Sequence, residues 1–234
     1  MPLPAKHALI RTRTATLSVT LLTAWTTNMA LSSVLKSTWA KPVAHLLCLL
    51  PLLLLMWAAI AGELGANPVE ALTHETGQWA LRLLLLTLAL SPLRQWTSEA
   101  GWIRFRRMLG LYAYFYGCCH FAIWSIADHS LDLSDMSEDV IKRPYITLGF
   151  SAFVLLLPLA LTSNQAMIRR LGRKWKTLHQ LVYAILLLAV LHFLWLVKAD
   201  YLEPLIYAII AVVLLLHRLG PVKRLNAKSF TAAR

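Results

Sequence analysis

Long apolar stretches recur along most of this chain, and they restrict its fold more than any other feature. An α-helix needs about 20 mostly apolar residues to cross the hydrocarbon core of a bilayer. Six stretches come near that length, at residues 44–61, 79–93, 109–127, 145–162, 178–197 and 204–219. With 58% hydrophobic and only 15% charged residues, the chain is too apolar to be one soluble domain. The sequence therefore predicts an all-α integral membrane protein, a bundle of six transmembrane helices.

The net charge of +12 is distributed in a way that predicts how these helices are oriented. Of the 23 Lys and Arg residues, 19 fall before residue 44, at 94–107, at 169–176 and from residue 218 onwards. Ten of the 11 acidic residues fall in the alternating segments 62–78, 128–144 and 198–203. Cytoplasmic loops are enriched in Lys and Arg, so both termini are expected to be cytoplasmic. The same distribution argues against a nucleic-acid partner and favours contact with membrane lipid.

Three segments of different composition predict the domain organisation. Residues 1–43 combine basic residues with many Ser and Thr and contain no acidic residue, so a disordered cytoplasmic extension is expected, with Met29 as an alternative start. Residues 44–219 are expected to form the transmembrane domain and residues 220–234 a basic cytoplasmic tail. Apart from runs of leucine, no internal repeat is evident in the sequence.

Three histidines, His120, His179 and His192, lie in or at the edge of the apolar stretches, where an ionisable side chain indicates a functional site. Facing helices of a bundle can supply the two axial imidazoles of a haem iron. His120 and His192 both fall in the outer halves of their helices, so they are expected to ligate one haem near the periplasmic side. Cys118-Cys119-His120 does not match C-x-x-C-H, which predicts a non-covalent haem b. The alternative for each histidine is a hydrogen bond to a neighbouring helix.

His179 lies at the cytoplasmic end of the same predicted helix as His192. At about 100° per residue, the two rings fall roughly 140° apart around a straight helix, so they cannot share a face without a kink or bulge. A second, cytoplasmic haem would need another ligand, for which His45 is the candidate; apart from it, only His217 in the sixth stretch lies at similar depth. The alternative for His179 and His45 is interfacial packing.

Charged residues near the ends of the predicted helices are candidates for holding anionic groups of a cofactor. His74 and Arg82, at the outer end of the second stretch, are expected to meet a haem propionate, although Arg82 could instead extend to the interface. On the cytoplasmic side, four arginines are candidates for an FMN phosphate or inner propionates, and membrane orientation alone also explains them. These are Arg106, Arg107, Arg169 and Arg173.

Motifs in both the loops and the apolar stretches resemble those of the MsrQ family, formerly YedZ. They include LGANPVE at 64–70, RRMLGL at 106–111, RPYITLG at 143–149, TSNQAM at 162–167 and LHFLW at 191–195. The resemblance covers roughly residues 41–220 in order. It is specific, because hydrophobicity alone does not produce the loop motifs.

The resemblance implies a haem-binding subunit of a protein-methionine-sulfoxide reductase system in the bacterial inner membrane, with a transmembrane bundle of the ferric-reductase type. Members of the family are associated with haem b and FMN. They pass electrons from the quinone pool, or from a cytosolic flavin reductase, to a periplasmic molybdopterin subunit, MsrP, which carries out the substrate chemistry. This chain has no Gly-rich dinucleotide motif, so no NAD(P)H site is expected.

Two other functions are compatible with the sequence. One is a stand-alone ferric or quinol-linked membrane reductase of the same superfamily. The other is a cofactor-free transporter or scaffold, which the scarcity of acidic residues in the apolar stretches makes less favourable. Segments 62–78 and 128–144 hold 8 of the 11 acidic residues and are the expected docking surface for a periplasmic partner.

Overall fold

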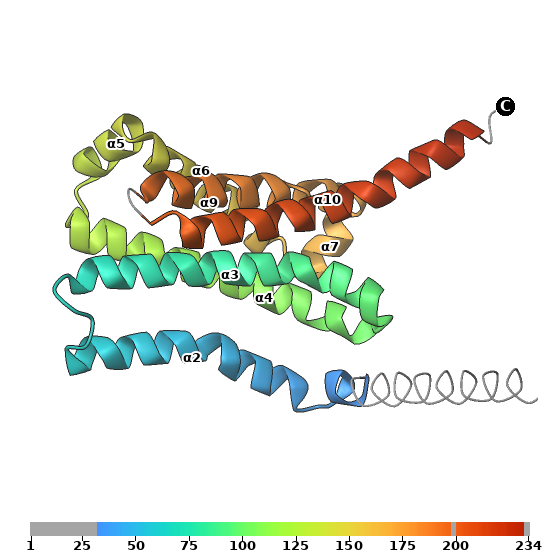
Figure 1. Ribbon diagram of the computed structural model, residues 1–234, viewed down its shortest axis with the longest axis horizontal. Helices are drawn as coiled ribbons and strands as arrows, with labels where there is room; N and C mark the ends of the chain where they lie inside the picture. The colour runs from blue at the N-terminus through green and yellow to red at the C-terminus, as the bar shows by residue number, and fades with distance from the viewer. Residues whose placement is uncertain (1–31, 198–199, 232–234) are drawn as a thin grey trace, which may run out of the picture.

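The computed structural model describes residues 32–197 and 200–231, and every regular element in these two ranges is a helix. Figure 1 shows the long helices side by side as a bundle, with α2 running alongside it. The long helices are α2 (Ala40–Ala61), α3 (Pro68–Thr97), α4 (Ile103–Ile123), α6 (Pro144–Leu161), α9 (Leu181–Leu196) and α10 (Leu202–Thr231). The short elements are η1 (Ala100–Trp102), the π-helical η2 (Trp124–Asp128), α5 (Leu133–Lys142), α7 (Gln165–Leu171) and α8 (Arg173–His179). The all-α class is confirmed, whereas most of the expected N-terminal extension falls outside the described residues.

Within the described residues, three helical segments are long and apolar enough to cross a membrane: Ala40–Ala61, Pro144–Leu161 and Arg173–Leu196. They coincide with the first, fourth and fifth apolar stretches. The other three stretches lie within α3, within α4 and η2, and within α10, where the helices also contain charged residues. Length and composition therefore support a membrane protein, and they support three of the six expected spans.

Capping residues explain where α2 ends and where α3 begins. Gly62 adopts the left-handed conformation, with φ 72°, and ends α2. Pro68 occupies the first turn of α3, and the Asn67 side chain accepts a hydrogen bond from the Glu70 N–H. As a result α3 begins well before its apolar stretch, and its first turns present polar side chains to the bundle.

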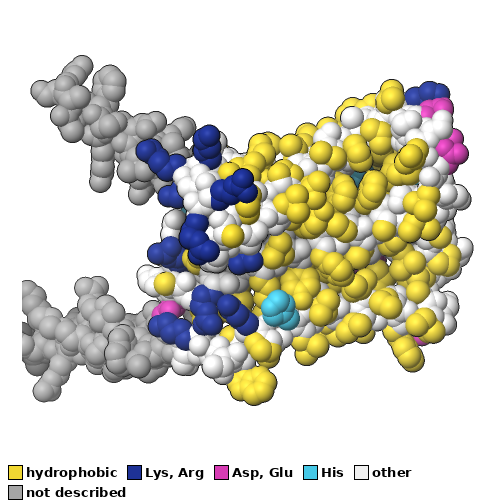
Figure 2. Space-filling model, turned by 180° about the vertical axis from the view of Figure 1, so that it is seen from behind, with side chains coloured by type: hydrophobic (Ala, Val, Ile, Leu, Met, Phe, Trp, Pro, Cys, Tyr) yellow, Lys and Arg dark blue, Asp and Glu magenta, His cyan; other side chains and the backbone are white. Residues whose placement is uncertain are grey.

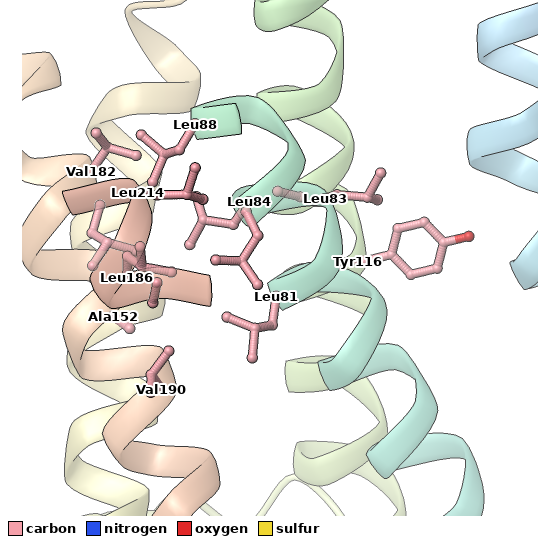
Figure 3. Packing of buried hydrophobic residues seen from close by; sticks show 14 of the residues in the cluster. Leu81, Leu83, Leu84, Leu88, Tyr116, Ala152, Val182, Leu186, Val190 and Leu214 are labelled. Carbon is pink, nitrogen blue, oxygen red and sulfur yellow. The ribbon is translucent and has the colours of Figure 1, made fainter. Parts of the chain in front are cut away.

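Apolar side chains of α3, α9 and α10 fill the centre of the bundle, as Figure 3 shows. Leu88 of α3 and Leu186 of α9 are almost fully buried, and Leu214 of α10 belongs to the same cluster. In a lipid environment such helices are held by close van der Waals packing more than by the hydrophobic effect. The fixed spacing of α3, α4, α6 and α9 depends on this packing.

A tyrosine of α4 attaches α2 to the bundle. Tyr116 is fully buried and points towards α2 (Figure 3). Its hydroxyl donates to the Cys48 carbonyl at 2.8 Å and accepts from the Leu52 N–H at 3.1 Å. In a regular α-helix these two backbone groups bond to each other, so the hydroxyl is inserted into the hydrogen-bond ladder of α2. Pro51 lacks an N–H and weakens the same turn.

Basic and acidic side chains gather at opposite ends of the bundle, as Figure 2 shows. The basic end contains the α3–α4 connection and the short helices α7 and α8. The acidic end contains α5 and the start of α3. This separation along the helix axes agrees with the positive-inside distribution of a membrane protein.

Candidate functional site

His120 of α4 and His192 of α9 face each other in the outer half of the bundle. Their ring centroids are 6.3 Å apart and their planes are inclined at 75°. The Nδ1–H of His120 donates to the Thr73 carbonyl at 2.8 Å, and that of His192 donates to the Tyr145 carbonyl at 2.7 Å. These bonds orient both rings and select the tautomer in which Nε2 is available to a metal.

Two glycines make room for these rings. A Cβ added at Gly77 would lie 3.0 Å from two atoms of the His120 ring. A Cβ added at Gly149 would lie 2.9 Å from two atoms of the His192 ring and 3.1 Å from a third. Both separations are shorter than ordinary van der Waals contact, which begins near 3.4 Å. Any larger residue at either position would therefore displace the histidine.

The two histidine environments are copies of one arrangement. Residues 73, 77 and 120 supply a carbonyl, a glycine and a histidine, and residues 145, 149 and 192 supply the same three, at a constant offset of 72. The helix pair α3–α4 thus repeats in the pair α6–α9. This repeat is not evident in the sequence, because only these few positions are matched and the packing residues around them differ. A glycine 43 residues before each histidine was the one available signal.

This geometry fits a haem iron between the two rings. Two metal–imidazole bonds of about 2 Å each, with each nitrogen roughly 1 Å from its ring centroid, give a centroid separation of about 6 Å, close to the 6.3 Å observed. No group of three or more His, Cys, Asp or Glu side chains that could hold a bare metal ion occurs in the described part of the chain. A pair of imidazoles suits an iron whose remaining four ligands come from a porphyrin.

His179 lies at the end of α8, where the helix is interrupted before α9. The Gln180 N–H bonds to the Thr177 carbonyl at 3.1 Å, a three-residue step that breaks the regular ladder. The sequence required such an irregularity if His179 and His192 were to face the same way. The His179 ring stacks on Trp175 at 3.9 Å, and its Nε2 lies 3.5 Å from the Ser163 hydroxyl. In the internal repeat, the position corresponding to His179 is Arg107.

The structure does not bring His45 to His179. His45 is exposed on α2, and its Nδ1 is hydrogen-bonded to the Tyr112 hydroxyl at 2.9 Å. A different histidine lies on α10: His217 contacts Trp96 edge-on, with ring centroids 6.0 Å apart. Within the residues whose side chains are described, buried His217 Nδ1 has no hydrogen-bond partner. His217 is therefore the better placed of the two histidines to meet a ligand inside the bundle.

Arg82 already has protein partners at the outer end of the bundle. Its guanidinium donates to the Tyr207 hydroxyl at 2.7 Å and to Glu203 at 3.3 Å, and Glu75 lies 3.8 Å away. Gln78 accepts a further bond from Arg82 and donates to Glu203 at 2.8 Å and to His74 Nδ1 at 3.2 Å. The expected anionic partner of Arg82 is thus supplied by α10 itself. The His74 ring also makes an edge-on contact with the ring of Phe193, which is the residue that follows His192.

The four arginines expected on the cytoplasmic side occupy different surroundings. Arg106 is half-buried and lies near both Arg218 and His179. Arg107 is exposed and lines a pocket between α2 and α4. Arg169 and Arg173 are exposed on α7 and α8. Arg106 is therefore the one that faces the inner end of the bundle.

Comparisons with known proteins identify relatives of this chain. Residues 76–190 match the family described as ferric reductase like transmembrane component, a range that includes Gly77, His120 and Gly149. The chain is 51% identical over 201 residues to the protein-methionine-sulfoxide reductase heme-binding subunit MsrQ of Xanthomonas axonopodis pv. citri, covering 83% of this chain and 91% of that protein. It is 48% identical over 185 residues to the protein of the same name from Herminiimonas arsenicoxydans, covering 77% and 84%.

Proposed function

Because the chain belongs to the MsrQ family of heme-binding subunits, we propose that it is a haem b electron-transfer subunit of a protein-methionine-sulfoxide reductase system. The single observation that carries this proposal is the pair His120 and His192, whose rings are separated by the distance that one iron requires. Such a haem supplies a one-electron carrier inside the bundle. The two carbonyls of Thr73 and Tyr145 hold the imidazoles in the ligating tautomer.

The proposal includes six membrane crossings. In addition to the three apolar segments, α3, α4 and α10 would cross, with both termini in the cytoplasm of a bacterial cell and the bundle in its inner membrane. The charge separation in Figure 2 supports this orientation. Electrons would then enter at the basic end, from the quinone pool or a cytosolic flavin reductase. They would leave at the acidic end to a periplasmic molybdopterin subunit, MsrP, where oxidised methionine is reduced.

We propose that a second cofactor with an anionic group binds at the basic end. Arg106 and Arg218 bring two positive charges together beside His179 at the inner end of the bundle, and His217 Nδ1 lacks a partner in the described region. These groups suit either the propionates of an inner haem ligated by His179 or the phosphate of FMN. Exposed Arg169 and Arg173 would add to the local positive potential without contacting the group.

Arg82 and His74 are proposed to adjoin the outer haem. Glu203 and Tyr207 already orient the Arg82 guanidinium, and Glu203 offsets part of its positive charge. Arg82 would therefore bind a propionate through the N–H groups that these partners leave free. A stand-alone ferric or quinol-linked reductase is the alternative within the superfamily. It differs in needing no molybdopterin partner. A cofactor-free transporter or scaffold would have no haem at all.

An absorption spectrum of the purified protein, with haem quantified per chain, tests the proposal. The parent should have the Soret and α bands of a low-spin haem b. His120→Ala and His192→Ala should each abolish the signal of the outer haem, and His179→Ala should leave it in place. His129→Ala, in the outer connection, is the matched control. Parental spectra and haem content in both outer variants would contradict the ligand assignment.

A further inference from the structure

A pocket of about 500 Å³ lies between α2 and α4, near the basic end of the bundle. Its polar part is formed by three cations, Lys41 of α2 and Arg104 and Arg107 of α4, together with the hydrogen-bonded pair His45 and Tyr112. Its apolar wall is formed by Met108, Leu111 and Phe115. The pocket therefore combines concentrated positive charge with an apolar surface one helical turn away.

No acidic side chain among the described residues neutralises the positive charge in this pocket. No acidic side chain lines it, and none of the ion pairs found among the described residues involves these three cations. Arg104 donates to the Leu35 carbonyl at 2.7 Å, which satisfies one N–H but not the charge. Three uncompensated cations around one cavity favour an anion with several oxygen acceptors.

The apolar wall continues directly from the cations along the helix axes. Leu111 and Phe115 lie four residues apart on one face of α4, so they form a continuous strip. Phe115 is 39% exposed, so part of this strip is uncovered by the protein. Such a strip can accommodate hydrocarbon, while a soluble anion would leave it uncovered.

We propose that this pocket binds an anionic phospholipid of the cytoplasmic leaflet, with its phosphate between Lys41, Arg104 and Arg107 and an acyl chain along Leu111 and Phe115. Basic pockets between transmembrane helices on the cytoplasmic side are recognised sites for anionic headgroups. The lipid would join α2 to α4 at the basic end, as Tyr116 joins them farther along. The site uses the membrane orientation proposed above but not the haem, so it can fail independently of the proposed function.

Native mass spectrometry of the detergent-purified holoprotein tests the site. The protein is titrated with phosphatidylglycerol, with phosphatidylcholine of the same acyl chains, and with FMN. Phosphatidylglycerol should bind at least tenfold more tightly than phosphatidylcholine. Near a membrane surface each Lys or Arg contributes about fivefold, so the triple variant K41Q/R104Q/R107Q should lose roughly a hundredfold in phosphatidylglycerol affinity.

The matched control is R170Q/K174Q/K176Q, which removes three exposed cations from α7 and α8. It should bind phosphatidylglycerol like the parent, and both variants are checked for parental helicity. Equal binding of the two lipids, or equal loss in both triple variants, would overturn a specific site. If FMN displaces phosphatidylglycerol from the parent, and K41Q/R104Q/R107Q loses FMN binding, the occupant of the pocket is a nucleotide and the lipid proposal is overturned.

Discussion

Adding one methyl group at Gly77 or Gly149 should disturb haem ligation without touching a ligand. The new Cβ of Gly149→Ala would lie 2.9 Å from two atoms of the His192 ring, and that of Gly77→Ala 3.0 Å from two atoms of the His120 ring. Ordinary contact begins near 3.4 Å, so each ring must retreat by roughly 0.4–0.5 Å. The carbonyls of Tyr145 and Thr73 hold the rings on the Nδ1 side.

Overpacking of this kind costs about 1–3 kcal/mol in a packed interior. If the cost falls on the iron–nitrogen bond, haem affinity should fall by about 5- to 150-fold. Gly149→Ala should be the more severe, because a third ring atom lies 3.1 Å away, whereas the third contact at Gly77 is 3.6 Å. A partly displaced imidazole should also convert low-spin haem to a high-spin or mixed form.

The assay is haem content per chain, together with the absorption and electron paramagnetic resonance spectra of the oxidised protein. Gly117→Ala is the matched control, since its Cβ would lie 3.6 Å from the Phe153 side chain, an ordinary contact. Haem content and spin state in Gly77→Ala and Gly149→Ala that match Gly117→Ala would refute the argument that these glycines make room for the ligands.

Three further outcomes are expected. Tyr116→Phe removes the hydroxyl between two backbone groups of α2, so it should destabilise the protein by about 1 kcal/mol and speed hydrogen exchange in α2. A chain starting at Met29 keeps Leu35, which packs against Gly101, so it should insert and bind haem normally; reversed topology would contradict this. Neutralising Asp135 and Glu138 should slow electron transfer to the periplasmic subunit several-fold at low salt, with haem content unchanged; equal rates would exclude α5 from docking.

The design of the last experiment follows from the structure of α5. Asp132 caps the helix by accepting from the backbone N–H groups of Ser134 and Asp135. Asp139 pairs with His129 at 3.2 Å and with Arg143 at 3.1 Å. Substituting either of these two aspartates would disturb the loop as well as its charge, so both are left unchanged.

Hydrophobicity and charge predicted the helices, their order and the two histidines that face each other. Depth along a helix can be counted from sequence, which is why His120 and His192 could be paired. The beginning of α3 was missed by several turns because its polar residues, including Gln78, face other protein groups rather than lipid. The sequence also suggested an anionic partner for Arg82, but not Glu203, which lies 121 residues away and approaches only through packing of α10.

The glycines and carbonyls around the ligands could not be predicted in the same way. Glycine is common in apolar helices, and its structural role depends on which side chain of the neighbouring helix packs against it. The pocket between α2 and α4 likewise depends on the distance between two helices, which hydropathy does not fix. His45 was paired with His179 on depth alone, and the structure instead gives it Tyr112.

The duplicated surroundings of His120 and His192 affect the orientation in which an asymmetric ligand such as haem binds. Both sides offer one carbonyl, one glycine and one imidazole, so the axial pair cannot distinguish a porphyrin from the same porphyrin turned over. The asymmetry comes from positions where the copies diverge: Arg82 corresponds to Val154, and His74 corresponds to Ile146. The polar network of α3 and α10 thus makes one side of the proposed haem position chemically distinct from the other. On this reasoning, Arg82→Val would yield two rotational isomers of bound haem in place of one.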